Sequence, residues 1–166
     1  FVVIVLATLA SFMVGQGSNS GTSVYLVRVG GTATYVGFLA VVFSVAAAVA
    51  RIVVGPVIDR RGRRNVIVAG GLFMLAGTLG PLASHELVPF VVWRFLQGVG
   101  FSACTTALAT AAADVLPQER LGEGIGYYGL GQAVSMSIGP ALALFLANTE
   151  PPENLFIGLA CCSVAA

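Results

Sequence analysis

Long runs without a charged residue limit what this chain can fold into. Residues 29–50 and 66–84 contain no charged side chain. About 20 helical residues, at 1.5 Å each, cross the roughly 30 Å of hydrocarbon in a bilayer. Only 9% of all residues are charged, whereas a soluble domain carries about 25%. The chain has too little charge to cover a surface in water, so we expect an all-α integral membrane protein.

The apolar segments are continuous rather than alternating, and they exceed the roughly 9–11 residues of a barrel strand. Polar residues, Gly and Pro interrupt them at 59–64, 85–86, 117–119 and 148–153. We therefore predict five spans and the start of a sixth, at about residues 1–26, 33–58, 65–84, 88–116, 120–147 and 154–166. We expect the chain to be truncated at both ends, inside its first and its sixth span.

Arginine is distributed unevenly between the two sides of these spans. The connections after the second and fourth spans hold Arg60, Arg61, Arg63, Arg64 and Arg120, whereas the opposite side holds only Arg28. Cytoplasmic loops of membrane proteins carry an excess of basic residues. We therefore expect the even-numbered connections to face the cytoplasm, in the plasma membrane. The net charge of +1 gives no reason to expect a nucleic acid as partner.

Catalytic and metal-binding patterns are not evident in the sequence. Its one histidine is His85, and its three cysteines, Cys104, Cys161 and Cys162, lie in apolar stretches without metal-ligand spacing. We interpret the cysteines as small packing residues. We expect neither enzymatic activity nor a cofactor.

The connection after the second span carries the most specific motif. It reads Gly55-Pro-Val-Ile-Asp59-Arg60-Arg-Gly62-Arg63-Arg64, which resembles the signature loop G-x-x-x-D-R-x-G-R-R of the major facilitator superfamily. The resemblance implies the N-terminal helical bundle of such a transporter, built from three-plus-three inverted repeats, with the C-terminal six-helix half absent from this chain. It also implies a secondary active transporter that works by alternating access. Its expected partners are a small-molecule substrate, the lipid bilayer and the missing half, and we expect a monomer.

Two further elements strengthen the resemblance. Arg94-x-x-Gln97-Gly98-x-Gly100 resembles the R-x-x-Q-G-x-G element of the fourth span. The fifth span resembles the G-x8-G-x3-G-P pattern of the drug/proton antiporter branch, with close helix contacts and a bend expected at Gly126, Ser135, Gly139 and Pro140. Ser135 replaces a glycine of that pattern. The resemblance implies a proton-coupled exporter that uses the proton gradient as its energy source. A proton-coupled importer of small metabolites such as sugars or organic acids is the alternative.

The signature loop also implies a gate. In the superfamily, the matching aspartate caps a helix of the other half and pairs with a motif arginine and with an acid at the end of the fourth span. The counterparts here are Asp59, Arg63 and Asp114, and we expect them to hold the cytoplasmic side closed. Gly55 and Gly62 would permit a close approach and a sharp turn. The alternative is that Asp59 is an ordinary interfacial charge.

Two arginines lie inside the predicted spans. A centrally placed arginine costs at least about 2.5 kcal/mol, which requires a buried partner or a wet cavity. Arg94 either reaches the outer interface beside Trp93 or faces the cavity for proton coupling or anion binding. Arg51, about 10 Å inside the second span, either reaches the interface or has a function.

The middle of the first span is unusually polar, because residues 16–21 contain no large apolar side chain. Such a face is costly against lipid, so it should face protein or a cavity. We predict substrate contacts at Gln16, Asn19, Gln97, Tyr127 and Gln132. The alternative is that these side chains form hydrogen bonds between helices.

Overall fold

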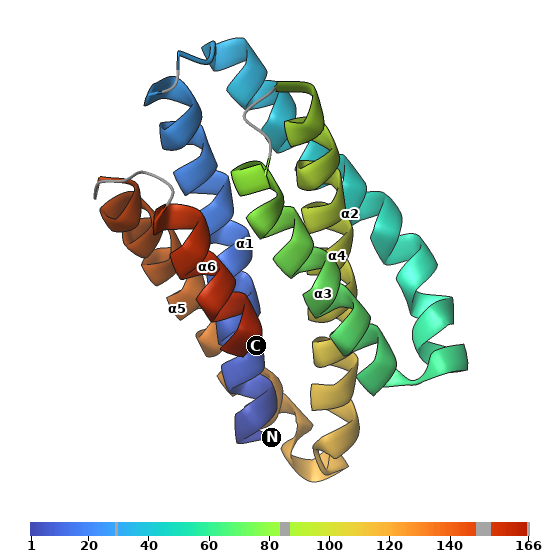
Figure 1. Cartoon of the computed structure of the whole chain (residues 1–166). Coiled ribbons are helices and arrows are strands. Elements are labelled where there is room, and N and C mark those ends of the chain that lie inside the picture. Colours follow the sequence, from blue (N-terminus) through green and yellow to red (C-terminus); the bar gives the residue numbers. More distant parts are fainter. Residues whose placement is uncertain (29, 84–86, 149–153, 166) are drawn as a thin grey trace.

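The computed structural model describes residues 1–28, 30–83, 87–148 and 154–165. Its elements are α1 (Val2–Arg28), α2 (Ala33–Arg61), α3 (Arg63–Ala83), α4 (Leu87–Val115), the 3-10 turn η1 (Gln118–Arg120), α5 (Leu121–Ala147) and α6 (Asn154–Ala165). The helices run alternately in opposite directions (Figure 1). The predicted connection at 85–86, most of the one at 148–153, and His85 lie outside the described residues.

The helical membrane fold predicted from the sequence is confirmed. Five helices are long and apolar enough to cross a membrane, and the described residues contain no strand. Large apolar side chains point outward along these helices, such as Ile52, which is 78% exposed, and Phe145, which is 68% exposed. Lipid is the solvent that suits such a surface, because hydrocarbon does not penalise exposed apolar atoms.

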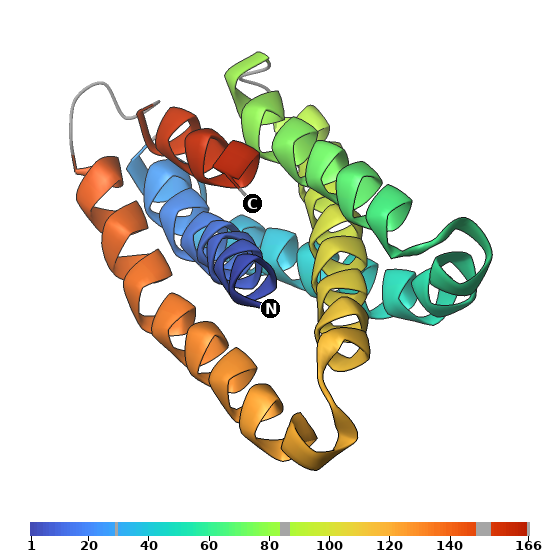
Figure 2. The same cartoon turned by 90° about the horizontal axis from the view of Figure 1, so that it is seen from below.

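The helices pair as two related sets of three. α1 packs along α5, and α2 packs along α4, while α4 also contacts α3 and α1 also contacts α6. Suppose that α1, α2 and α3 correspond to α4, α5 and α6. The α1–α5 pair then corresponds to the α4–α2 pair, and the α3–α4 pair corresponds to the α6–α1 pair. This is the arrangement that a three-plus-three inverted repeat requires. Seen along the bundle, α3 and α6 lie side by side, away from the connection between α4 and α5 (Figure 2).

Glycines allow these helices to approach closely. A Cβ added at Gly98 on α4 would lie 2.5 Å from the Phe43 carbonyl oxygen of α2. One added at Gly100 would lie 2.5 Å from the Met74 backbone nitrogen of α3. Membrane helices associate through such small-residue contacts, because lipid provides little hydrophobic drive between them. The glycines of the Arg94-x-x-Gln97-Gly98-x-Gly100 element therefore serve in helix packing.

The predicted turn at 59–64 is wrong in its extent. α2 continues through Arg61 and α3 begins at Arg63, so Gly62 alone separates them. Arginine is a good helix former, whereas Gly62 adopts a φ of 79°, which favours glycine. The Gly62 N–H donates to the Ile58 carbonyl at 2.9 Å and closes the end of α2. Asp59 therefore lies in the last turn of a helix rather than in a loop.

Candidate functional site

One end of the bundle gathers most of its arginines. We call it the arginine-rich end: it is where α2 meets α3 and α4 meets α5, and it contains Arg60, Arg61, Arg63, Arg64 and Arg120. Arg63, at the start of α3, forms an ion pair with Asp114, near the end of α4. Their side chains are 46% and 45% exposed. Two of the three predicted gate residues are thus in contact.

The remaining gate residues are placed differently from the ion pair. Asp59 is exposed and has no hydrogen bond or ion pair within the part of the chain that the structure describes. A Cβ added at Gly55 would meet nothing within 4 Å, so the close approach predicted there is not made within this bundle. Gly62 does supply the predicted sharp turn.

A buried arginine joins α4 to α1. Arg94 is 2% exposed. Its Nη1 donates to Gln97 Oε1 at 2.7 Å, and its Nη2 donates to Asn19 Oδ1 of α1. The guanidinium carbon also lies 5.0 Å from the centre of the Phe43 ring on α2, a cation–π contact. The sequence left two positions open for Arg94, the outer interface and a cavity. The structure excludes the interface, because Arg94 is buried between helices.

Gln97 extends the same set of hydrogen bonds to α3 and adds a second bond to α1. Its Nε2 donates to Ser18 Oγ of α1 at 2.8 Å and to Thr78 Oγ1 of α3 at 2.9 Å. Gln97 is 2% exposed, so it lines no open cavity in this structure. Gln97 and Asn19 thus form the hydrogen bonds between helices that were the alternative to substrate contact.

A hollow with both polar and apolar lining opens between four helices. Its volume is about 310 Å³. The lining side chains come from α1, α2, α4 and α5, and they are Phe12, Arg51, Thr105, Thr106, Ala109, Tyr128 and Gln132. We call it the four-helix hollow. It contains the predicted Gln132, and Gln16 lies one helical turn beyond Phe12 on the same face of α1.

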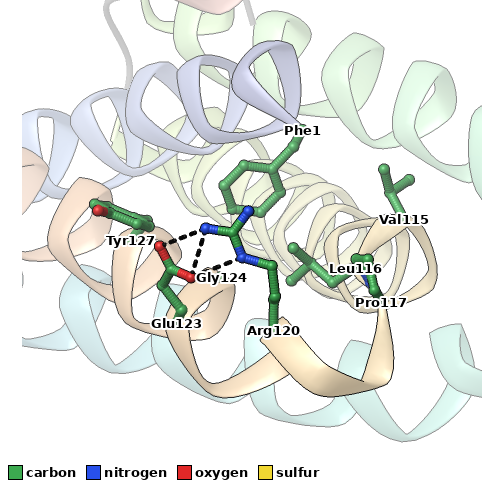
Figure 3. Close-up of a pocket in the computed structure, with 8 residues that line it drawn as sticks. All are labelled: Phe1, Val115, Leu116, Pro117, Arg120, Glu123, Gly124 and Tyr127. Atoms are coloured by element: carbon green, nitrogen blue, oxygen red, sulfur yellow. Dashed lines mark hydrogen bonds and ion pairs between the residues drawn. The ribbon is translucent and has the colours of Figure 1, made fainter.

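The predicted Tyr127 lies elsewhere, at the arginine-rich end. There it lines a separate pocket of about 300 Å³ with Phe1, Leu116 and Gly124 (Figure 3). Beside it, Arg120 Nε donates to Glu123 Oε2 at 3.0 Å. Tyr128, the residue after Tyr127, lines the four-helix hollow instead. The spacing in the sequence could have identified Tyr128 rather than Tyr127, because Tyr128 and Gln132 are four residues apart and share a helix face.

Comparison with known proteins places this sequence in a family. The sequence model of the Major Facilitator Superfamily matches residues 4–166. The chain belongs to the major facilitator superfamily. It is 30% identical to an uncharacterized MFS-type transporter of Methanocaldococcus jannaschii over 149 residues, which are 89% of this chain and 38% of that protein.

Two relatives with informative names match less of their own length. The multidrug resistance protein Stp of Mycobacterium tuberculosis is 32% identical over 140 residues, which are 80% of this chain and 26% of that protein. The facilitated glucose transporter member 10 of Xenopus tropicalis is 29% identical over 114 residues, which are 69% of this chain and 20% of that protein. The chain spans well under half the length of these relatives.

The fifth-span residues of this superfamily member make the close contacts predicted for them, with one exception. Ser135 is buried, and its Oγ lies 3.0 Å from the Leu9 carbonyl oxygen of α1. A Cβ added at Gly139 would lie 2.9 Å from the Met13 carbonyl oxygen, also on α1. Gly126 is the exception, because its added Cβ would meet nothing within 4 Å. α5 stays helical through Pro140, so the bend remains a prediction.

Metal chemistry finds no support in the described part of this superfamily member, which contains no cluster of three His, Cys, Asp or Glu side chains that could hold an ion. Cys104 is buried and lies 3.4 Å from Ser11 Oγ, as a packing residue can.

Proposed function

We propose that the protein is a secondary active transporter that moves small organic molecules by alternating access, and that it is a proton-coupled exporter. The observation that carries the proposal is the four-helix hollow. Its lining comes from α1 and α2 of one repeat and from α4 and α5 of the other, whereas α3 and α6 contribute no lining residue. Substrate sites of such transporters lie at the interface between repeats, near the middle of the bilayer.

The gate explains how such a site could open to one side at a time. The Arg63–Asp114 ion pair links α3 of the first repeat to α4 of the second. An ion pair in a wet interface is weak, so small rearrangements of charge can break it. Asp59 stands at the same end of the bundle without a partner in the described residues, and the missing half would supply one.

The proposal fixes an orientation and a setting. By the excess of arginine, the arginine-rich end faces the cytoplasm, and the membrane is the plasma membrane. The transporter acts as a monomer, and the proton gradient rather than a cofactor drives it. Export is favoured over import by the relative named as a multidrug resistance protein.

The test uses the full-length protein in proteoliposomes that contain a pH-sensitive dye. A proton gradient is imposed, and cationic drugs and small metabolites are added in turn. We expect substrate-dependent proton flux opposite in direction to the substrate, and its loss in Asp59→Asn and Arg94→Ala. If every compound moves without proton flux, proton coupling is wrong. If no compound moves, the transport proposal itself is wrong.

Import is the second candidate function, and one observation favours it. The relative named as a facilitated glucose transporter matches 69% of this chain, so the same bundle suits uptake of a polar metabolite. The proteoliposome assay separates the two directions. Proton flux in the same direction as the substrate would establish a symporter of sugars or organic acids.

A further inference from the structure

We infer that the four-helix hollow binds the anionic group of an organic acid, and that Arg51 is the residue that recognises it. The inference rests on the proposed function, because it names the substrate class of the same transporter. It concerns a residue for which the sequence left both a structural and a functional interpretation open.

The first argument is the depth of Arg51. It lies ten residues before Arg61, where α2 ends, which places it about 15 Å along the helix from the arginine-rich end. Because Asp59, Arg60 and Arg61 extend α2 into the polar interface, this agrees with the predicted depth of about 10 Å inside the span. The Arg51 side chain lines the hollow with Tyr128 and Gln132 of α5. The Arg51 side chain is exposed in this bundle and faces the space between the helices, at a depth where a charge shielded from water needs an anionic partner.

The second argument is that the bundle supplies no such partner. Within the part of the chain that the structure describes, Arg51 has no hydrogen bond and no ion pair. The acidic residues of that part all lie toward the arginine-rich end, and they are Asp59, Asp114, Glu119 and Glu123. Asp59 is eight residues further along α2, at a distance of about 12 Å. No acidic side chain among the described residues compensates the positive charge of the hollow.

The third argument is the chemistry of the lining. Beside the guanidinium, Tyr128, Thr106 and Gln132 bring a phenol, a hydroxyl and an amide to the hollow, and each of these groups can donate a hydrogen bond. A carboxylate only accepts, and the planar guanidinium fork matches its two oxygens. A cationic drug would instead meet the like charge of Arg51.

The fourth argument concerns the rest of the ligand. Phe12 and Ala109 add apolar side chains to the lining of the hollow. A volume of about 310 Å³ accommodates a small apolar body, and binding sites commonly combine such walls with a few orienting polar groups. The ligand class is therefore a carboxylate attached to an aryl or alkyl body.

The test measures equilibrium binding and transport separately on the full-length protein. Benzoate and octanoate are compared with benzamide and octanamide, which keep the body and lose the charge, and with benzylammonium, which reverses it. The variants are Arg51→Gln and Arg51→Lys. Arg61→Gln is the matched control, because it removes an exposed arginine from the same helix outside the hollow.

We expect at least one carboxylate to bind about tenfold or more tightly than its amide, since a charge-assisted hydrogen bond is lost with the charge. Arg51→Gln should remove this preference, Arg51→Lys should keep part of it, and Arg61→Gln should keep all of it. Amide binding that survives in Arg51→Gln would show that the variant is folded, and Tyr128→Phe provides a milder second variant.

Two results would overturn the inference. One is equal binding of carboxylates and amides by the unsubstituted protein. The other is a carboxylate preference that Arg51→Gln leaves unchanged, as expected if a carboxylate from the missing half neutralises Arg51. Carboxylate binding without transport would contradict the proposed function and leave the inference standing. Transport that shows no dependence on ligand charge would contradict the inference and leave the proposed function standing.

Discussion

Arg63, the first residue of α3, and Asp114, one residue before the end of α4, form an ion pair at the arginine-rich end of the bundle. Both side chains are nearly half exposed, so we expect the pair to contribute no more than about 1 kcal/mol to stability. Its importance lies in position, because α3 and α4 belong to different repeats. A weak link between the repeats can open and close during the transport cycle that we propose.

Breaking this pair should affect transport more than stability. In full-length Asp114→Asn, we expect the free energy of unfolding to fall by less than about 1 kcal/mol and the transport rate to fall several-fold. Thermal unfolding and proteoliposome flux measure the two effects. Arg120→Gln is the control, because it breaks a similar exposed pair with Glu123 that joins no two repeats. Equal losses of transport in both variants would contradict a gating role.

Gly98 of the fourth span should tolerate an added methyl group less well than Gly71 of the third. A Cβ at Gly98 would lie 2.5 Å from the Phe43 carbonyl oxygen, whereas one at Gly71 would meet nothing within 4 Å. We expect Gly98→Ala to destabilise the protein by about 1–3 kcal/mol, as overpacking does, and Gly71→Ala to be neutral or stabilising. Melting temperatures in one detergent check both. A neutral Gly98→Ala would mean that α2 and α4 pack more loosely than described.

The buried hydrogen bonds of Arg94 should not tolerate lysine. An ammonium lacks the planar fork that contacts Gln97 and Asn19 together, so we expect Arg94→Lys to cost about 1–3 kcal/mol. Thr78→Val removes one acceptor of Gln97 and should cost less. The double variant tests coupling, since residues of one network are not additive. Additive effects would contradict a shared network.

The two adjacent tyrosines of α5 should respond differently to loss of their hydroxyl. Tyr128 lines the four-helix hollow, and Tyr127 lines the pocket beside Phe1. We expect Tyr128→Phe to weaken substrate binding, because a hydrogen-bond donor is lost, and Tyr127→Phe to leave it unchanged. Substrate affinity in the full-length protein decides the matter. The opposite ranking would restore the interpretation of Tyr127 as the substrate residue.

The sequence predicted the helices well because the bilayer imposes a length on apolar segments. Every described helix was found, and most of its ends were located within a few residues. The largest error was at 59–64. There the arginines extend α2 into the polar interface, where charged residues form helix readily, and only Gly62 with its positive φ stops it. The glycine was visible in the sequence, but the strength of the flanking helix formers was underestimated.

The direction of polar side chains was harder to predict than their depth. Hydropathy gives the depth of Arg94, but a helix that is apolar all round does not show which face meets protein. For Gln97 and Asn19 the sequence therefore left substrate contact and interhelical hydrogen bonds open, and the structure shows the hydrogen bonds. The spacing of Tyr128 and Gln132 could have identified the hollow. Thr105 and Thr106, which also line it, carried no signal in a run of small residues.

Alternating access itself can be measured on two residues, one in the hollow and one beyond it along α1. Gln132 lines it, and Ser20 lies two helical turns beyond Phe12 on the same face of α1. Gln132→Cys and Ser20→Cys in the full-length protein are labelled with a membrane-impermeant thiol reagent and compared with the unsubstituted protein. The account predicts that substrate or a reversed proton gradient raises the labelling rate of one and lowers that of the other. Rates that rise and fall together would contradict it.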